Sequence, residues 1–182
     1  MFLVLGLRPG QLFALHRDDV EGNRIRVDQS ASWKQDMVDP KTKASNGFVW
    51  MPDKLAADLV DWMDGMKDRR PETLLFATNR GTPMDRHNYL GRNIKKIAAA
   101  ALKARQERCT AIGEVLTDGY LTGVNHQAFR RTCATWAQEG GTLKDVQAML
   151  RHSSPAMTAG IYIQPIPESV KRAVESLDEK LR

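Results

Sequence analysis

Tyr162 follows His152 by ten residues in the segment LRHSSPAMTAGIYIQ, and Arg130 and Arg131 lie upstream in AFRRTCAT. Arginine presents a planar fork of N–H donors that binds two phosphate oxygens and keeps its charge. Histidine can donate a hydrogen bond to a phosphate oxygen, and a tyrosine hydroxyl can attack phosphorus when neighbouring cations favour its ionised form. These residue types in this order therefore indicate a phosphate site with a covalent nucleophile, which can cleave a DNA phosphodiester without a metal.

Two further candidates lie nearer the start of the chain, Arg8 in GLRPGQLFALHRDDV and Lys41 in PKTKAS. Lysine is a point charge that can give up a proton when it is desolvated, so it suits the acid that protonates a leaving group. An arginine after a turn, taken alone, is more often a surface ion-pair former, so Arg8 depends on the other residues for its assignment. Lys43 would face the same side of a strand as Lys41 and is its rival.

The amino-acid composition limits the classes of protein to which this chain can belong. A chain of 182 residues with 42% hydrophobic residues can bury one core, so we expect one domain over residues 1–182. The net charge of +5 fits a polyanionic partner, although a modest excess of this kind also occurs in proteins that bind no nucleic acid. The two cysteines and four histidines show no ligand spacing, which predicts a reduced cytoplasmic protein without metal or cofactor.

The apolar start MFLVLGL is too short for a signal peptide or a membrane span, so no membrane partner is expected. It is better explained as the last turns of a core helix. A turn at Pro9-Gly10 is expected to follow it.

Periodicity predicts a mainly helical α+β fold with a small antiparallel β-sheet. Expected strands are RIRVDQSA and the returning GFVWMP, joined by a long hairpin tip over residues 32–46. Expected helices are QLFALHRDDV, PDKLAADLVDWMDGM, Asp85 to about Arg108, and about 125–139, 142–151, 155–163 and 167–182.

The helix that begins at Asp85 carries a run of basic residues that reaches Arg108. Such a run is either a solvated helix face or a track for the DNA backbone, and the sequence does not separate the two. The candidate DNA-binding residues are Lys43, Arg92, Lys95 and Lys96.

The motifs resemble those of the tyrosine recombinase (phage integrase) family. GLRPGQLFALHRDDV resembles its first arginine box, and PKTKAS resembles its β-hairpin lysine, with Lys41 at the matching position before the threonine. RRTCATWAQEGGTLKDVQAMLRHSSPAMTAGIY is similar to the second arginine box and the segment that runs on to the nucleophile. Any one box is a weak signal, whereas four in family order from about residue 3 to 165 are specific.

The resemblance implies a mechanism and partners. Tyr162 would attack a scissile phosphate to form a 3′-phosphotyrosyl bond, and Lys41 would protonate the departing 5′-hydroxyl. Arg8, Arg130 and His152 would stabilise the pentacovalent state. The implied partner is double-stranded DNA, on which the family acts as a homotetramer, with residues 167–181 as a candidate helix for reaching a neighbouring subunit.

The sequence departs from the family pattern in three ways. The histidine expected three residues before the second arginine is replaced by Gln127, and His126 lies one residue earlier, a helical rotation of about 100°. Gln127 can hydrogen-bond a phosphate oxygen but cannot act as a base, so slower chemistry is expected. The usual glutamate of the first box is Gln11. The family's N-terminal core-binding domain is not represented, so a truncated catalytic domain is expected.

The resulting hypothesis is site-specific DNA cleavage and rejoining by an integrase of a mobile element. One rival is a non-catalytic DNA-binding remnant of such a protein, which would not require the complete set of reactive residues. A second rival is a type IB topoisomerase, which shares the chemistry. It is less favoured because the arginine boxes resemble those of integrases and the chain is short.

Overall fold

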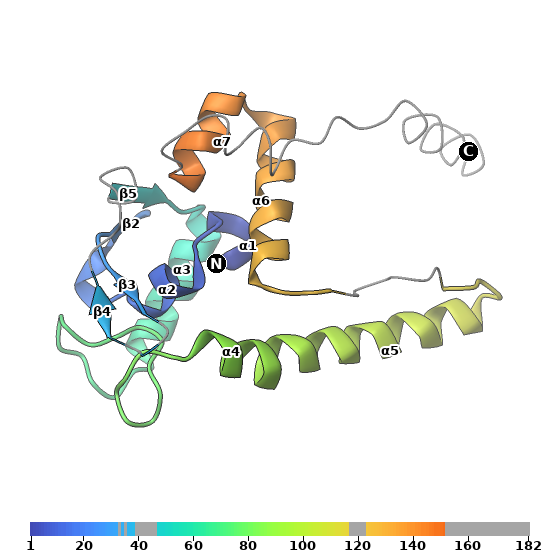
Figure 1. The fold of residues 1–182 in the computed structure, drawn as a ribbon, viewed down its shortest axis with the longest axis horizontal. Coiled ribbons are helices and arrows are strands. Elements are labelled where there is room, and N and C mark those ends of the chain that lie inside the picture. Colours follow the sequence, from blue (N-terminus) through green and yellow to red (C-terminus); the bar gives the residue numbers. More distant parts are fainter. Residues whose placement is uncertain (33, 35, 39–46, 117–122, 152–182) are drawn as a thin grey trace.

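The computed structural model describes residues 1–32, 34, 36–38, 47–116 and 123–151 (Figure 1). Its helices are α1 Phe2–Leu5, α2 Pro9–Phe13, α3 Asp53–Asp64, α4 Arg86–Tyr89, α5 Lys95–Ala111, α6 His126–Gly140 and α7 Leu143–Leu150. Its strands are β1 Val20–Glu21, β2 Arg24–Val27, β3 Ser30–Ala31, β4 Met37–Val38 and β5 Gly47–Trp50. All strand pairs are antiparallel, so the predicted fold class is confirmed.

The larger sheet has the strand order β1-β2-β5. Ile25 of β2 lies opposite Val49 of β5, and both are buried, whereas their neighbours Arg24 and Trp50 are exposed. This alternation is typical of a sheet with one face on the core. The predicted strand GFVWMP is therefore confirmed as β5.

The prediction of one strand over RIRVDQSA is wrong. The chain leaves the larger sheet after Val27, and Ser30–Ala31 pairs with β4 in a separate two-stranded sheet. Ser30 lies against α2 at Gly10, where a Cβ atom would come 2.5 Å from the Ser30 hydroxyl oxygen. Period-two alternation marks extended backbone, but it does not say which partner the backbone pairs with.

The first predicted helix is also shorter and earlier than expected. Pro9 begins α2 at its first position, where a fixed φ and a missing N–H suit a helix start, so Pro9-Gly10 is not a turn. The helix ends at Phe13 because the following backbone hydrogen-bonds elsewhere. The Leu75 N–H donates to the Leu15 carbonyl at 2.8 Å, and the Arg17 N–H donates to the Thr73 carbonyl at 3.0 Å.

The main core lies where α1 and α2 meet β2, β5 and α3. Phe2 and Leu5 of α1 are buried in it, which confirms a core helix at the start of the chain. The Phe2 ring meets Phe13 of α2 edge-on at 6.1 Å and stacks on Phe129 of α6 at 6.2 Å. These contacts set α1 beside α6 (Figure 1).

The predicted helix from Asp85 is confirmed, as α4, a π-helical turn over Leu90–Ile94, and α5. The Asp85 carboxylate caps it by accepting from the Asn88 N–H at 2.7 Å. Figure 1 shows α5 extending away from the sheets. Helices α3, α6 and α7 also match their predictions, whereas the helices expected over 155–163 and 167–182 lie outside the described residues.

Candidate active site

Arg130 is the centre of the candidate site and is only 2% exposed. Its guanidinium donates to the carbonyls of Gly6 and of Leu150, the latter at 2.6 Å. Gly6 ends α1 and Leu150 is the last residue of α7, so both carbonyls belong to helix ends, where they lack a partner within the helix. A cation is favoured at such an end. Arg130 thereby joins three segments that are far apart in the sequence.

Gly6 makes this arrangement possible. It adopts a left-handed φ of 57°, which favours glycine. A Cβ atom on it would also lie 2.7 Å from Cδ2 of Leu150 and 3.2 Å from Sγ of Cys133. The backbone of the segment that leads into Arg8 therefore approaches α6 and α7 at a distance that only glycine permits.

Gln11 links the first arginine box to the end of α7. Its side-chain oxygen accepts from the Arg8 backbone N–H at 3.1 Å and from Nη2 of Arg151 at 2.9 Å. Both Gln11 and Arg151 are buried, while Arg8 is half-buried. The neutral amide thus supports the backbone at Arg8 and holds the residue that directly precedes His152.

The site is electrostatically positive. Burial is the main cause that lowers the pKa of the Arg151 guanidinium to about 10, and the charges of Arg130 and then Arg8 contribute to the same shift. Within the residues that the structure describes, neither Arg8 nor Arg151 forms an ion pair with a carboxylate. Three guanidinium groups in one region favour a bound anion such as a phosphate.

The first two residues of α6, His126 and Gln127, differ in their surroundings. His126 lies among aromatic rings, with its ring centroid 4.9 Å from Phe2 and 6.3 Å from Tyr89, and its Nε2 is 3.0 Å from the Arg86 carbonyl oxygen. It is therefore a packing histidine. Gln127 is exposed on the first turn of α6, and its contact with a phosphate stays a prediction.

Lys41, Lys43, His152 and Tyr162 lie outside the described residues, so their place beside Arg130 stays a prediction. Of the predicted catalytic set, the structure describes Arg8, Gln127 and Arg130. It brings the segment of Arg8 to Arg130 through Gly6.

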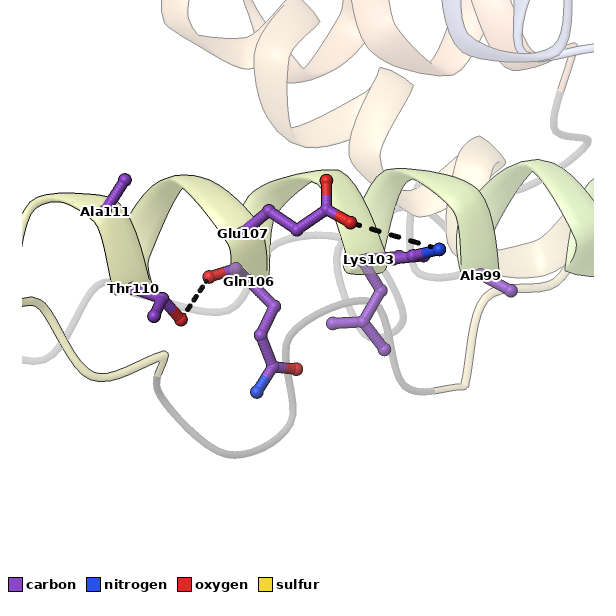
Figure 2. Close-up of a pocket in the computed structure, with 7 residues that line it drawn as sticks. Ala99, Lys103, Gln106, Glu107, Thr110 and Ala111 are labelled. Carbon is purple, nitrogen blue, oxygen red and sulfur yellow. Dashed lines mark hydrogen bonds and ion pairs between the residues drawn. The ribbon is translucent and has the colours of Figure 1, made fainter.

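The basic residues of the helix that begins at Asp85 differ in whether they form ion pairs. Arg92, Lys95 and Lys96 are exposed near its start and form no ion pair with the described residues. Further along, Lys103 lies 3.9 Å from Glu107, beside an open hollow lined by Ala99, Gln106, Thr110 and Ala111 (Figure 2). The Lys103 charge is thus balanced locally, whereas the first three cations stay candidates for the DNA backbone.

Sequence reasoning missed the roles of Gly6 and Arg151. Arg151 could have been identified from the sequence, because it is a basic residue at the end of a helix and directly precedes His152. For Gly6 nothing in the local pattern revealed its close approach to Leu150 and Cys133.

A metal site and a membrane-spanning helix are both absent from the part of the chain that the structure describes. No group of three or more His, Cys, Asp or Glu side chains there could hold a metal ion. No described helix combines the length and apolar character that crossing a membrane requires.

The phage integrase family profile matches residues 1–168. A tyrosine recombinase XerC-like protein of Caldanaerobacter subterraneus subsp. tengcongensis is 26% identical over 200 residues, which cover 96% of this chain and 46% of that protein.

Solved structures share the fold. The Tn1549 transposon integrase in complex with circular intermediate DNA has a TM-score of 0.69 at 21% identity, covering 97% of this chain and 57% of that one. The XerA recombinase has a TM-score of 0.65 at 21% identity, covering 97% of this chain and 55% of that one. The chain spans about half the length of these relatives. Since the family profile covers most of its length, the chain belongs to the phage integrase family.

Proposed function

We propose that this chain carries the chemistry of site-specific DNA cleavage and rejoining through a 3′-phosphotyrosyl intermediate. The observation that supports it most is the convergence of the two arginine boxes, in which Arg130 holds the Gly6 carbonyl two residues before Arg8. Both arginines act electrostatically on Arg151, so the three charges share one region. Membership of the phage integrase family adds support, and the related Tn1549 integrase was solved with DNA bound.

In the proposed first step, the ionised hydroxyl oxygen of Tyr162 forms a bond to the scissile phosphorus. The bond from phosphorus to the 5′-oxygen breaks, and Lys41 supplies the proton that makes a free 5′-hydroxyl. Arg8, Arg130 and His152 neutralise charge on the non-bridging oxygens of the pentacovalent state. Cationic neighbours also favour ionisation of the attacking tyrosine.

In the second step a 5′-hydroxyl from a partner strand attacks the phosphotyrosyl phosphorus. The bond to Tyr162 breaks, and the proton of the incoming hydroxyl returns to Lys41. One phosphoester bond forms for each one broken, so neither ATP nor a metal ion is consumed. We propose a homotetramer on double-stranded DNA as the assembly, with Arg92, Lys95, Lys96 and Lys43 contacting the DNA backbone.

Gln127 is expected to slow this chemistry. It can donate a hydrogen bond to a phosphate oxygen, but it cannot exchange a proton as a histidine does. Gln127→His should therefore raise the rate of cleavage. An unchanged rate would remove this position from the site.

Covalent trapping tests the proposal. The chain is incubated with a pool of nicked duplex oligonucleotides, and the products are separated on a denaturing gel with Tyr162→Phe alongside. A protein–DNA adduct formed by the natural sequence and lost in Tyr162→Phe is the expected result. Salt-sensitive DNA binding without any adduct would instead favour a non-catalytic DNA-binding protein, and sequencing trapped DNA would identify the target site.

A further inference from the structure

Arg151 has an unusual backbone conformation for an arginine. It follows the last residue of α7 with φ 53° and ψ 51°, and among the described residues it is the only non-glycine with positive φ. Helices commonly end in this left-handed conformation, but with glycine, because a Cβ atom is strained there. An arginine at this position is therefore held by its surroundings in a conformation that it does not favour by itself.

The Arg151 side chain is buried as well as strained. It is 7% exposed, and its Nη2 donates to the Gln11 side-chain oxygen at 2.9 Å. Its Nε and Nη1 have no hydrogen-bond partner among the described residues. Buried donors without partners are costly, and more so when the group is charged.

The neighbours of Arg151 add to this cost. Burial, and then the positive charges of Arg130 and Arg8, lower the pKa of the Arg151 guanidinium to about 10. Gln11, which faces it, is neutral, and no described carboxylate pairs with it. A strained residue that also buries an uncompensated charge is typical of a binding site, where the ligand supplies the missing partner.

We propose that Arg151 is a third phosphate-binding arginine, whose Nε and Nη1 donate to a non-bridging oxygen of the DNA phosphate held by Arg8 and Arg130. This proposal rests on the proposed function for the identity of the anion. Gln11 then acts as a positioning residue, because it fixes Nη2 of Arg151 and leaves the other two donors for the phosphate.

The proposal predicts opposite effects on stability and on binding. Arg151→Gly removes both the strain and the buried charge, so the melting temperature of the free chain should rise. Arg151→Gln removes the charge alone and should raise it less. Both variants should bind a random-sequence duplex pool about tenfold more weakly, because each lacks one charge-assisted contact to phosphate.

A phosphate titration measures the contact without requiring cleavage. Inorganic phosphate is added at constant ionic strength, with chloride as the balancing anion, and the melting temperature is followed for the natural sequence, Arg151→Gly and Arg131→Gln. Arg131 is the matched control because it is an exposed arginine next to Arg130 on the same helix. The natural sequence and Arg131→Gln should be stabilised by phosphate more than Arg151→Gly.

Equal phosphate stabilisation in all three proteins would overturn the proposal. So would a variant at position 151 that melts lower than the natural sequence or fails to fold, since Arg151 would then be a structural residue. Failure of the proposed function is distinguishable, because it removes the covalent adduct while leaving the dependence of phosphate binding on Arg151 intact.

Discussion

The Arg130 guanidinium donates to the Leu150 carbonyl at 2.6 Å, which ties α6 to the end of α7. The same guanidinium also binds the Gly6 carbonyl. A residue proposed for phosphate chemistry therefore also fixes the ends of two helices. Its planar fork suits both tasks, because it offers several donors in fixed directions.

Arg130→Lys should lower the free energy of unfolding by about 2 kcal/mol or more, because one ammonium replaces a fork that makes two charge-assisted hydrogen bonds. Urea denaturation followed by circular dichroism measures the change. Arg131→Lys is the control, since Arg131 is exposed on the same helix. Equal unfolding midpoints for the two variants would show that the carbonyl contacts of Arg130 contribute nothing to stability.

Substitutions at two glycines measure the cost of backbone strain and the cost of close packing separately. Gly6 and Gly22 have φ values of 57° and 58°, but a Cβ atom would meet Leu150 at 2.7 Å in the first case and nothing within 4 Å in the second. Gly22→Ala should cost about 1–2 kcal/mol of stability from strain alone. Gly6→Ala should cost at least about 1 kcal/mol more, because it also overpacks the core. Thermal unfolding that gives the same loss for both variants would contradict this close approach.

The start of α7 should confer a pH dependence on stability. The Asp145 carboxylate accepts from the Thr142 hydroxyl at 2.6 Å and from the Thr142 N–H at 2.8 Å, and these bonds lower the pKa of Asp145. A carboxyl with a lowered pKa in the folded state stabilises the protein above its ordinary pKa, and this contribution is lost as the pH falls toward the lowered value.

Asp145→Asn should therefore melt below the natural sequence at neutral pH, and the difference should shrink below about pH 4. Melting curves between pH 7 and pH 3 measure it. Glu139→Gln, at an exposed position near the end of α6, is the control for the loss of one carboxylate. If the difference in melting temperature between Asp145→Asn and the natural sequence is the same at every pH, this carboxylate is not the source of the pH dependence.

Cys133 should react slowly in the native chain. Burial raises the pKa of its thiol, the nearby Arg130 charge opposes this only in part, and its sulfur lies 3.6 Å from the Val4 carbonyl oxygen. Because the thiolate is the reactive form, alkylation by iodoacetamide at neutral pH should be at least about tenfold slower than in urea. Peptide mass spectrometry measures it at Cys133, and equal rates in the two conditions would contradict the buried position.

The sequence predicted the elements with clear patterning. The apolar spacing over PDKLAADLVDWMDGM predicted α3, although its buried residues are Ala56 and Leu59, while Val60 and Trp62 are exposed. The strand β5 was predicted as the segment that returns from the hairpin tip. The division of RIRVDQSA between two sheets was not predictable, since it depends on the distant partner β4 and on Gly10. The early end of α2 similarly depends on hydrogen bonds to residues 73 and 75.

The residues of the candidate site were predicted only in part, and on different grounds from the elements of the fold. Arg8 and Arg130 were identified from a resemblance over several motifs, because local periodicity says nothing about segments more than a hundred residues apart in the sequence. Arg151 was missed because its side-chain burial and left-handed backbone arise only from packing against Gln11 and Arg130. The roles of Lys41, His152 and Tyr162 stay predictions.

The most direct measurement is to digest a trapped protein–DNA adduct and identify the modified peptide by mass spectrometry. We predict one nucleotide-bearing peptide that contains Tyr162, joined through a 3′-phosphate, with a free 5′-hydroxyl on the released strand. An adduct on another residue, a link through a 5′-phosphate, or DNA cleavage that persists in Tyr162→Phe would contradict the proposed chemistry.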